Sequence, residues 1–178
     1  MGDGVITTPI NKNFLSQLEF RFLLNRAPHV NFFVQKVTIP QITLDATPQA
    51  ATPFVRRPIP GDHIEFQELQ VEFLVDEDFR NYLEIQEWLY GLGFPHNFSE
   101  FATLKDQPKV TGEAIFSDVK IIIMNSASLV NYEITFCDAF PTSLSALEFD
   151  TSDTDVEYIS ATTTFAYTTY QFERIRGE

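Results

Sequence analysis

The sequence has little cysteine and no long apolar run, and both absences limit what the chain can be. Cys137 is the single cysteine among 178 residues, which excludes an internal disulfide framework; its place in an alternating run predicts a buried, small apolar side chain. Apolar runs such as residues 121–124 are far shorter than the roughly 20 residues of a membrane-spanning helix. Residues 1–10 lack the basic start and apolar core of a secretory signal. We therefore expect a soluble chain without membrane insertion.

Combinations of residues that carry out catalysis are also missing. The three histidines, His29, His63 and His96, lie far apart in the sequence, and none has a partner at the spacing of a metal site. The chain has no glycine-rich phosphate loop, no nucleophile elbow and no Cys/His arrangement. The sequence therefore predicts a protein that is not an enzyme and that uses no metal ion or cofactor.

Two groups of acidic residues need a separate explanation. Glu68 and Glu72 recur at the period of a strand, which indicates a solvated strand face and not a catalytic carboxylate pair. Asp150, Asp153 and Asp155 are faintly similar to a calcium loop, but their spacing and the missing bidentate Glu depart from the EF-hand pattern. We expect a solvated hairpin turn there.

Basic residues are few and unevenly distributed. Residues 1–60 carry six basic and three acidic side chains, whereas residues 61–178 carry six basic and 22 acidic ones, and the net charge is −13. The excess of acid either keeps the chain soluble or lets a basic patch of one copy meet an acidic patch of the next. It argues against tight nucleic-acid binding, because affinity for phosphate comes largely from Lys and Arg.

Aromatic residues are abundant, and they favour strands because rings pack well on pleated faces: the chain has 18 Phe and 6 Tyr. Alternation predicts a strand over Glu68–Val75 with one wet face, and another over residues 130–136. Acidic residues followed by apolar residues at helical spacing predict one flanking α-helix at about residues 78–90. Further strands are expected over residues 19–24, 31–39, 118–124, 144–149 and 157–172. The fold class is therefore mainly β.

A chain of this length fits one domain, residues 1–178, and three segments in it lack periodicity. Residues 1–13 are polar and unpatterned, which predicts a flexible N-terminal arm. Residues 41–61 hold four prolines and two adjacent arginines, which predicts a long Pro/Arg loop. Residues 94–116 have scattered aromatics, which predicts a surface insertion.

Taken in order, these parts resemble a known family. The segments that carry the likeness are Val37–Pro40, the run Arg57-Pro58-Ile59-Pro60-Gly61-Asp62, Phe66-x-x-Leu69-x-Val71-x-Phe73, the acid-capped helix with Trp88, Tyr132–Phe136, Phe140-Pro141-Thr142, and Leu147-x-Phe149-Asp150. This order is similar to that of the tail tube proteins of contractile-tailed, T4-like phages, which are related to the inner tubes of pyocins and type VI secretion systems. The likeness covers roughly residues 19–172, and it lies in the order of short apolar motifs.

The resemblance implies an antiparallel β-barrel or sandwich with one flanking helix. Such subunits assemble as stacked hexameric rings into a hollow conduit through which DNA passes during ejection. The implied partners are further copies of the chain, the tail sheath protein, baseplate and tail-terminator proteins, and genomic DNA that is not tightly bound. The implied location is the virion tail, after assembly in the host cytoplasm.

Two alternatives stay open. A tube-like baseplate initiator or a tail-terminator protein would share the same fold. A monomeric β-barrel that binds a small apolar ligand would also explain the aromatic residues, but it would not explain the uneven charge or the long Pro/Arg loop.

A corner at Phe140-Pro141-Thr142 would let a strand leave one sheet and enter the next, since the missing N–H of a proline costs no ladder bond at an edge. We expect Phe140 to pack into the end of the barrel.

Three sets of residues are candidates for the work of such a subunit. Inter-ring contacts are expected at Arg56, Arg57 and Asp62, on the assumption that the basic loop reaches an acidic surface of a neighbouring ring. The Thr-rich run with Thr162, Thr163 and Thr164 is a candidate for an inter-subunit edge strand or a lumen-facing strand. Some of the acidic residues are expected to face the lumen, where they would avoid ion pairing with phosphate, and the candidates are Glu65, Glu68, Glu72, Glu133, Asp150, Asp153 and Asp155.

Overall fold

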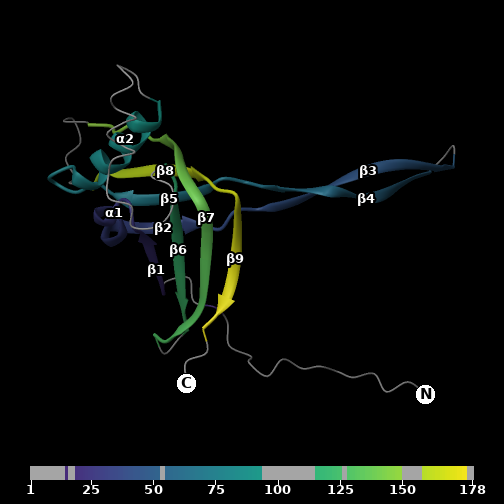
Figure 1. Ribbon diagram of the computed structural model, residues 1–178, viewed down its shortest axis with the longest axis horizontal. Helices are drawn as coiled ribbons and strands as arrows, with labels where there is room; N and C mark the ends of the chain where they lie inside the picture. Colours follow the sequence, from purple (N-terminus) through teal and green to yellow (C-terminus); the bar gives the residue numbers. More distant parts are fainter. Residues whose placement is uncertain are drawn as a thin grey trace.

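The computed structural model describes residues 15, 19–52, 55–93, 115–125, 128–149 and 158–175 (Figure 1). Nine strands and two helices lie in these ranges: β1 (Phe20–Leu24), α1 (Pro28–Phe33), β2 (Val34–Thr38), β3 (Ile42–Thr52), β4 (Val55–Phe66), β5 (Leu69–Leu74), α2 (Arg80–Gly93), β6 (Ser117–Met124), β7 (Val130–Leu144), β8 (Ser160–Ala166) and β9 (Thr169–Arg174). The mainly β class is confirmed. The predicted N-terminal arm, and the predicted insertion up to residue 114, lie outside the described residues.

Two antiparallel sheets share one strand, β7. The first sheet has the order β1-β6-β7-β9, and the second has the order β2-β5-β8 followed by the C-terminal part of β7. In Figure 1 the strands β6, β7 and β9 run together, while β2, β5 and β8 run across them. The two sheets therefore pack in the crossed arrangement in which one strand turns the corner between layers.

The corner in β7 begins at Asp138, two residues before the predicted one. Asp138 has a φ of 56°, in the left-handed region that non-glycine residues rarely adopt, and its N–H donates to Asp118 Oδ1 at 3.3 Å. Before this point β7 pairs with β6 and β9, and from Phe140 onward it pairs with β8. The ring of Phe140 packs against the core, 5.8 Å from that of Phe116. The predicted strand over residues 144–149 is wrong beyond Leu144, where β7 ends.

The core lies between the sheets and follows from strand alternation. Leu69, Val71 and Phe73 of β5 are fully buried, as the sequence predicts, and Ile134 and Phe136 of β7 face them from the other sheet. These side chains form one cluster with residues of both helices.

Both helices cover one end of this core. The predicted helix is present as α2, which buries Ile85 and Trp88, and the Trp88 indole N–H donates to the carbonyl of Ile115 at 3.1 Å. The shorter α1 was not predicted: residues 31–33, expected in a strand, belong to a helix that starts with Pro28, a residue suited to a first helical turn.

The predicted strand over residues 157–172 is two strands, β8 and β9. They are separated at Tyr167 and Thr168, where the Thr168 N–H donates to the carbonyl of Cys137 at 3.0 Å. This contact returns the chain from the second sheet to the first, where β9 pairs with β7.

The predicted loop over residues 41–61 is wrong, because β3 and β4 form a long hairpin that projects from the rest of the molecule (Figure 1). In the described chain each of its strands pairs with the other alone, so the missing N–H of a proline costs no ladder bond where that position faces outward, and Pro48 lies opposite Pro58. The strands approach closely at Gly61, where a Cβ would lie 2.7 Å from the carbonyl oxygen of Asp45. We call this element the long hairpin, and the two crossed sheets with both helices the body.

Candidate assembly interface

The long hairpin has one apolar face that the described chain leaves partly exposed. Ile42 lies opposite Phe66 and Leu44 lies opposite Ile64, so these four side chains share a face, and their exposed fractions are 52%, 37%, 52% and 58%. The sequence analysis missed this face. The alternation at each end of the Pro-rich stretch, Ile42-x-Leu44 and Ile64-x-Phe66, was the available signal. A two-stranded ribbon is marginally stable alone, so the apolar face suits a packing partner.

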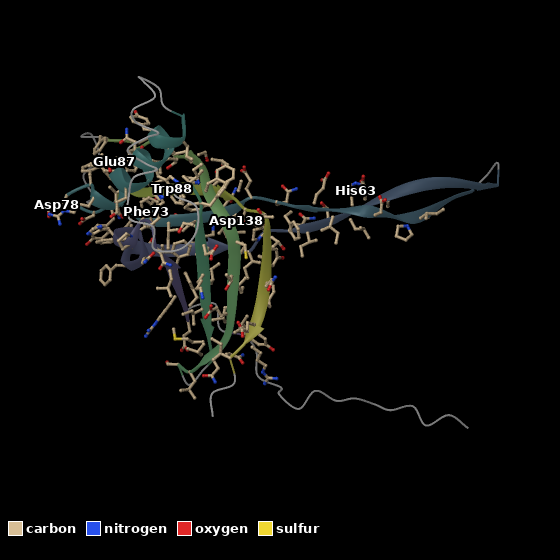
Figure 2. All side chains as sticks on the ribbon, viewed as in Figure 1. His63, Phe73, Asp78, Glu87, Trp88 and Asp138 are labelled. Carbon is tan, nitrogen blue, oxygen red and sulfur yellow. The ribbon has the colours of Figure 1, made fainter. Side chains whose placement is uncertain are left out.

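The long hairpin contains the predicted inter-ring residues, with Arg56 and Arg57 toward its outer end and Asp62 nearer its root. Arg56 pairs with Ala50 and Arg57 with Gln49 across the two strands, near the end of the hairpin that is far from the body. Asp62 is fully solvated, and its Oδ1 lies 2.6 Å from Nδ1 of the neighbouring His63. In Figure 2, His63 lies on the hairpin well away from Phe73 and Trp88 of the core.

Aromatic rings join the root of the long hairpin to the body. The ring of Phe66 lies 5.6 Å from that of Tyr170 and 6.1 Å from that of Tyr167, and both tyrosines contact Phe136 at 5.2 and 4.9 Å. The Tyr167 hydroxyl donates to the carbonyl of Gln67 at 2.8 Å. Burial, with a smaller effect of Tyr170, raises the pKa of Tyr167 to about 12. Tyr167 is therefore a neutral hydrogen-bond donor at physiological pH.

The prediction of an edge strand at Thr162, Thr163 and Thr164 is wrong. Strand β8 pairs with β5 on one side and with β7 on the other, and Thr163 is buried with its hydroxyl donating to the carbonyl of Ser143 at 3.0 Å. Threonine-rich segments are found on central and edge strands alike, because their composition does not say which neighbouring strands are present. In the described part of the body, the strands with one unpaired edge are β1, β2, β9 and the C-terminal part of β7.

The outer face of the second sheet is polar. Side chains from three strands surround a shallow depression of about 210 Å³, and they are Lys36, Thr38, Gln70, Glu72 and Thr162. Glu68 precedes this face at the start of β5 and is exposed. Hydroxyl groups continue the polar surface toward β7, where the hydroxyls of Thr142 and Thr164 lie 2.9 Å apart.

The outer face of the first sheet is different, because Glu133 on this face forms an ion pair. Glu133 accepts a hydrogen bond from Lys120 Nζ at 2.6 Å, and this bond raises the pKa of Lys120. The Glu133 side chain is only 16% exposed.

The structure therefore does not gather the predicted lumen acids on one surface. Glu65 is exposed on the long hairpin, Glu68 and Glu72 lie on the outer side of the second sheet, and Glu133 lies on the first sheet. Asp150, Asp153 and Asp155 lie outside the described residues.

Within the described ranges, no three His, Cys, Asp or Glu side chains come together as metal ligands. The same residues include no helix with the length and apolar character to cross a membrane. The features that stand out in the described residues are a partly exposed apolar ribbon, unpaired strand edges and a polar sheet face.

Known proteins are similar to this chain in sequence and in fold. The chain is 28% identical to the tail tube terminator protein of Enterobacteria phage T4 over 142 residues, which are 79% of this chain and 76% of that protein. Among solved structures, the tube-terminating cap of the anti-feeding prophage superposes with a TM-score of 0.59 at 15% identity, over 97% of this chain and 99% of the other. A chain of the sheath–tube complex of the extracellular contractile injection system PVC gives a TM-score of 0.54 at 15% identity, over 92% and 94%.

The profile of the family described as phage tail tube protein matches residues 5–173, nearly the whole sequence. The chain belongs to the phage tail tube protein family.

Proposed function

We propose that this chain is a structural subunit of the tube of a contractile phage tail, where copies form hexameric rings that stack into a conduit for DNA. The observation that carries the proposal is the long hairpin, whose apolar face is 37–58% exposed at four facing positions. A ribbon of this kind is an incomplete element, and a neighbouring copy completes it by covering the face.

Two further contacts join the copies in this proposal. The unpaired edge of β2 on one copy pairs with an unpaired edge of the first sheet on the next, which removes the exposed edges of both. The outer end of the long hairpin, with Arg56 and Arg57, reaches the acidic surface of a copy in the adjacent ring, and Asp62 contributes from nearer the root. A head-to-tail contact of this kind repeats along an axis, as a tube requires.

The role of the apolar face is tested by placing the same charge on the two faces of the ribbon. Leu44→Lys places a cation on the apolar face and should abolish ring formation, whereas Thr43→Lys places it on the opposite face beside Glu65 and should leave rings intact. Light scattering and negative-stain microscopy measure the rings, and circular dichroism checks that both variants are folded. Normal rings from Leu44→Lys would refute the proposed contact.

The inter-ring contact needs a separate variant, Arg56→Glu with Arg57→Glu. We expect it to form single rings that stack poorly, because reversed charges oppose an acidic partner surface. Stacks of normal length would contradict this part of the proposal.

For the bore we propose the outer face of the second sheet, with Glu68 and Glu72. Its amides, hydroxyls and acids offer phosphate few cations to bind, so DNA passes without being held. Assembled rings carrying Glu68→Lys and Glu72→Lys should retain duplex DNA in a gel-shift assay, and the retention should weaken with salt. Rings with Glu77→Lys and Glu87→Lys provide the control, because Glu87 lies on α2 and Glu77 just before it, and α2 packs on the inner side of this sheet, with Trp88 6.2 Å from Phe165. Equal retention by both variants would argue against this bore.

Position at the end of the tube is favoured by one specific observation. The 28% identical relative is a tail tube terminator, and the tube-terminating cap matches over almost the full length of both chains. A terminator adds to a finished tube and stops its growth, whereas a tube subunit extends it. Adding purified chain to growing tubes should therefore shorten them if the chain is a terminator and lengthen them if it is a tube subunit.

In either position we propose the virion tail as the location, assembly in the host cytoplasm, and the sheath and baseplate as neighbours. The alternative of a ligand-binding monomer finds little support, because Phe73, Phe136 and Phe165 occupy the space between the sheets.

A further inference from the structure

The root of the long hairpin is held by more than strand pairing. A root cluster of four rings comes from separate parts of the chain: Phe66 from the end of β4, Phe136 from β7, Tyr167 from the turn after β8, and Tyr170 from β9. Phe66 is the hairpin's own contribution, and it contacts both tyrosines. Edge-to-face contacts, such as that of Phe66 with Tyr170, and stacked contacts, such as that of Phe136 with Tyr170, restrict how one ring can rotate against another.

Two hydrogen bonds reinforce the root cluster. The Tyr167 hydroxyl donates to the carbonyl of Gln67, directly after β4, at 2.8 Å. The Gln67 N–H donates to the carbonyl of Gln41, directly before β3, at 3.1 Å. Tyr167 thus fixes the exit of β4, and Gln67 ties that exit to the entry of β3, so both strands leave the body from one restrained point.

The length of the hairpin makes this restraint important. Strand β3 has 11 residues, so it extends for about 36 Å. At that length, a rotation of about 10° at the root displaces the outer end by about 6 Å, which is more than the spacing of neighbouring strands in a sheet. Contacts made along the hairpin therefore depend on its direction.

We propose that the root cluster presets the direction of the long hairpin before a second copy is met. The hairpin is then a preformed docking element, and association does not have to order it, which lowers the entropic cost of binding. Phe66 and Tyr167 are the positioning residues. The consequence for assembly rests on the proposed function, whereas the direction of the hairpin is a property of the single chain.

The test measures that direction in the monomer. In a Cys137→Ser background, spin labels at Asp62→Cys on the hairpin and Glu87→Cys on α2 report one intramolecular distance, measured at a concentration where light scattering shows monomer. We expect a narrow distribution for the parent chain. Phe66→Ala should broaden it at least twofold, and Tyr167→Phe, which loses only the hydroxyl, should broaden it less. Phe32→Ala, a change at an 86% exposed phenylalanine of α1, is the control and should leave it unchanged.

The outcomes distinguish the positioning role of the root cluster from the proposed contact of the long hairpin with a second copy. A distribution in Phe66→Ala and Tyr167→Phe as narrow as in the parent chain would overturn the positioning role. Broadening together with a severalfold loss of rings at equal subunit concentration, with an unchanged melting temperature, supports both the positioning role and the proposed assembly. Broadening with normal ring formation would support the positioning role but refute the proposed contact of the hairpin with a second copy.

Discussion

The body and the long hairpin use the same local pattern with opposite results. Leu69, Val71 and Phe73 alternate with polar residues in β5 and are fully buried, while Leu44 and Ile64 alternate in the same way on the hairpin and remain 52% and 58% exposed. What differs is the facing layer: β5 has the first sheet and the helices across the core, whereas the described chain places no layer over Leu44 and Ile64 and contacts the hairpin face at its root, through Phe66. Alternation therefore specifies an amphipathic strand, and burial depends on whether a second layer comes from the same chain or from another copy.

Strand pairing gives the same contrast. Strands β5 and β8 are paired on both sides, and their interior positions hold no proline. Each hairpin strand is paired on one side only, and prolines occupy facing positions such as Pro48 and Pro58. Proline-rich composition on its own thus indicates strands with a free side as readily as it indicates a loop.

The largest expected effect compares one substitution in the two regions. Leu69→Ala leaves a cavity in the core and should lower the free energy of unfolding by about 2–5 kcal/mol. Leu44→Ala on the exposed ribbon should change it by less than about 0.5 kcal/mol in the monomer. Urea denaturation followed by circular dichroism measures both. A large loss of monomer stability from Leu44→Ala would mean that the hairpin is folded into the body more tightly than its exposure indicates.

A smaller effect is expected at the corner of β7, a feature that the straight ribbon of the hairpin lacks. Asp138→Val should destabilise the body by about 1–2 kcal/mol, because a β-branched residue at a φ of 56° brings Cβ against the backbone. Asp138→Gly should be nearly neutral or stabilising, since glycine adopts this conformation without strain. The difference in urea midpoint between the two variants checks the prediction. Equal midpoints would show that the corner does not depend on this conformation.

Sequence patterns were sufficient to predict the features that depend on residues close together in the sequence. The strand at β5, its buried face, the helix α2 and the mainly β class all follow from local periodicity and were predicted. The corner was placed within two residues, because Pro141 marks it. The acidic run before α2 and the apolar residues at helical spacing fixed its position to within about three residues at either end.

Features that depend on pairing between strands far apart in the sequence could not be predicted from local patterns. The Thr-rich strand β8 was predicted at an edge, but β5 and β7 flank it, and its sequence does not identify either neighbour. Residues 41–61 were predicted as a loop, since the prolines concealed two strands that only pair with each other. The candidate acids were grouped by charge alone, and the structure separates Glu72 from Glu133 by assigning them to different sheets.

A modest effect is expected for the ion pair on the outer face of the first sheet, which contrasts with the unpaired acids of the second. Glu133→Gln should cost about 0.2–1 kcal/mol, because Lys120 is 43% exposed and water screens the pair. The control Glu173→Gln removes a like charge directly across from Glu133 and should be neutral or slightly stabilising. Added salt should reduce the loss in Glu133→Gln. A loss of several kcal/mol would show that Glu133 is a buried charge in the monomer.

The last predicted effect is a loss of stability at alkaline pH, and it concerns Tyr167 at the junction between the body and the long hairpin. Burial raises the pKa of Tyr167 from 10.0 to about 12, so the folded chain favours the neutral phenol. Its contribution to stability is complete below pH 10 and is lost as the pH rises through about 12, because the unfolded chain ionises first. Stability of the parent chain should fall across this window, and the fall should be shallower in Tyr167→Phe, which has no proton to lose. Urea midpoints at a series of alkaline pH values measure the difference. Parallel curves for the two proteins would mean that the Tyr167 hydroxyl at the root is solvated, and that the hydrogen bond to Gln67 does not hold the hairpin.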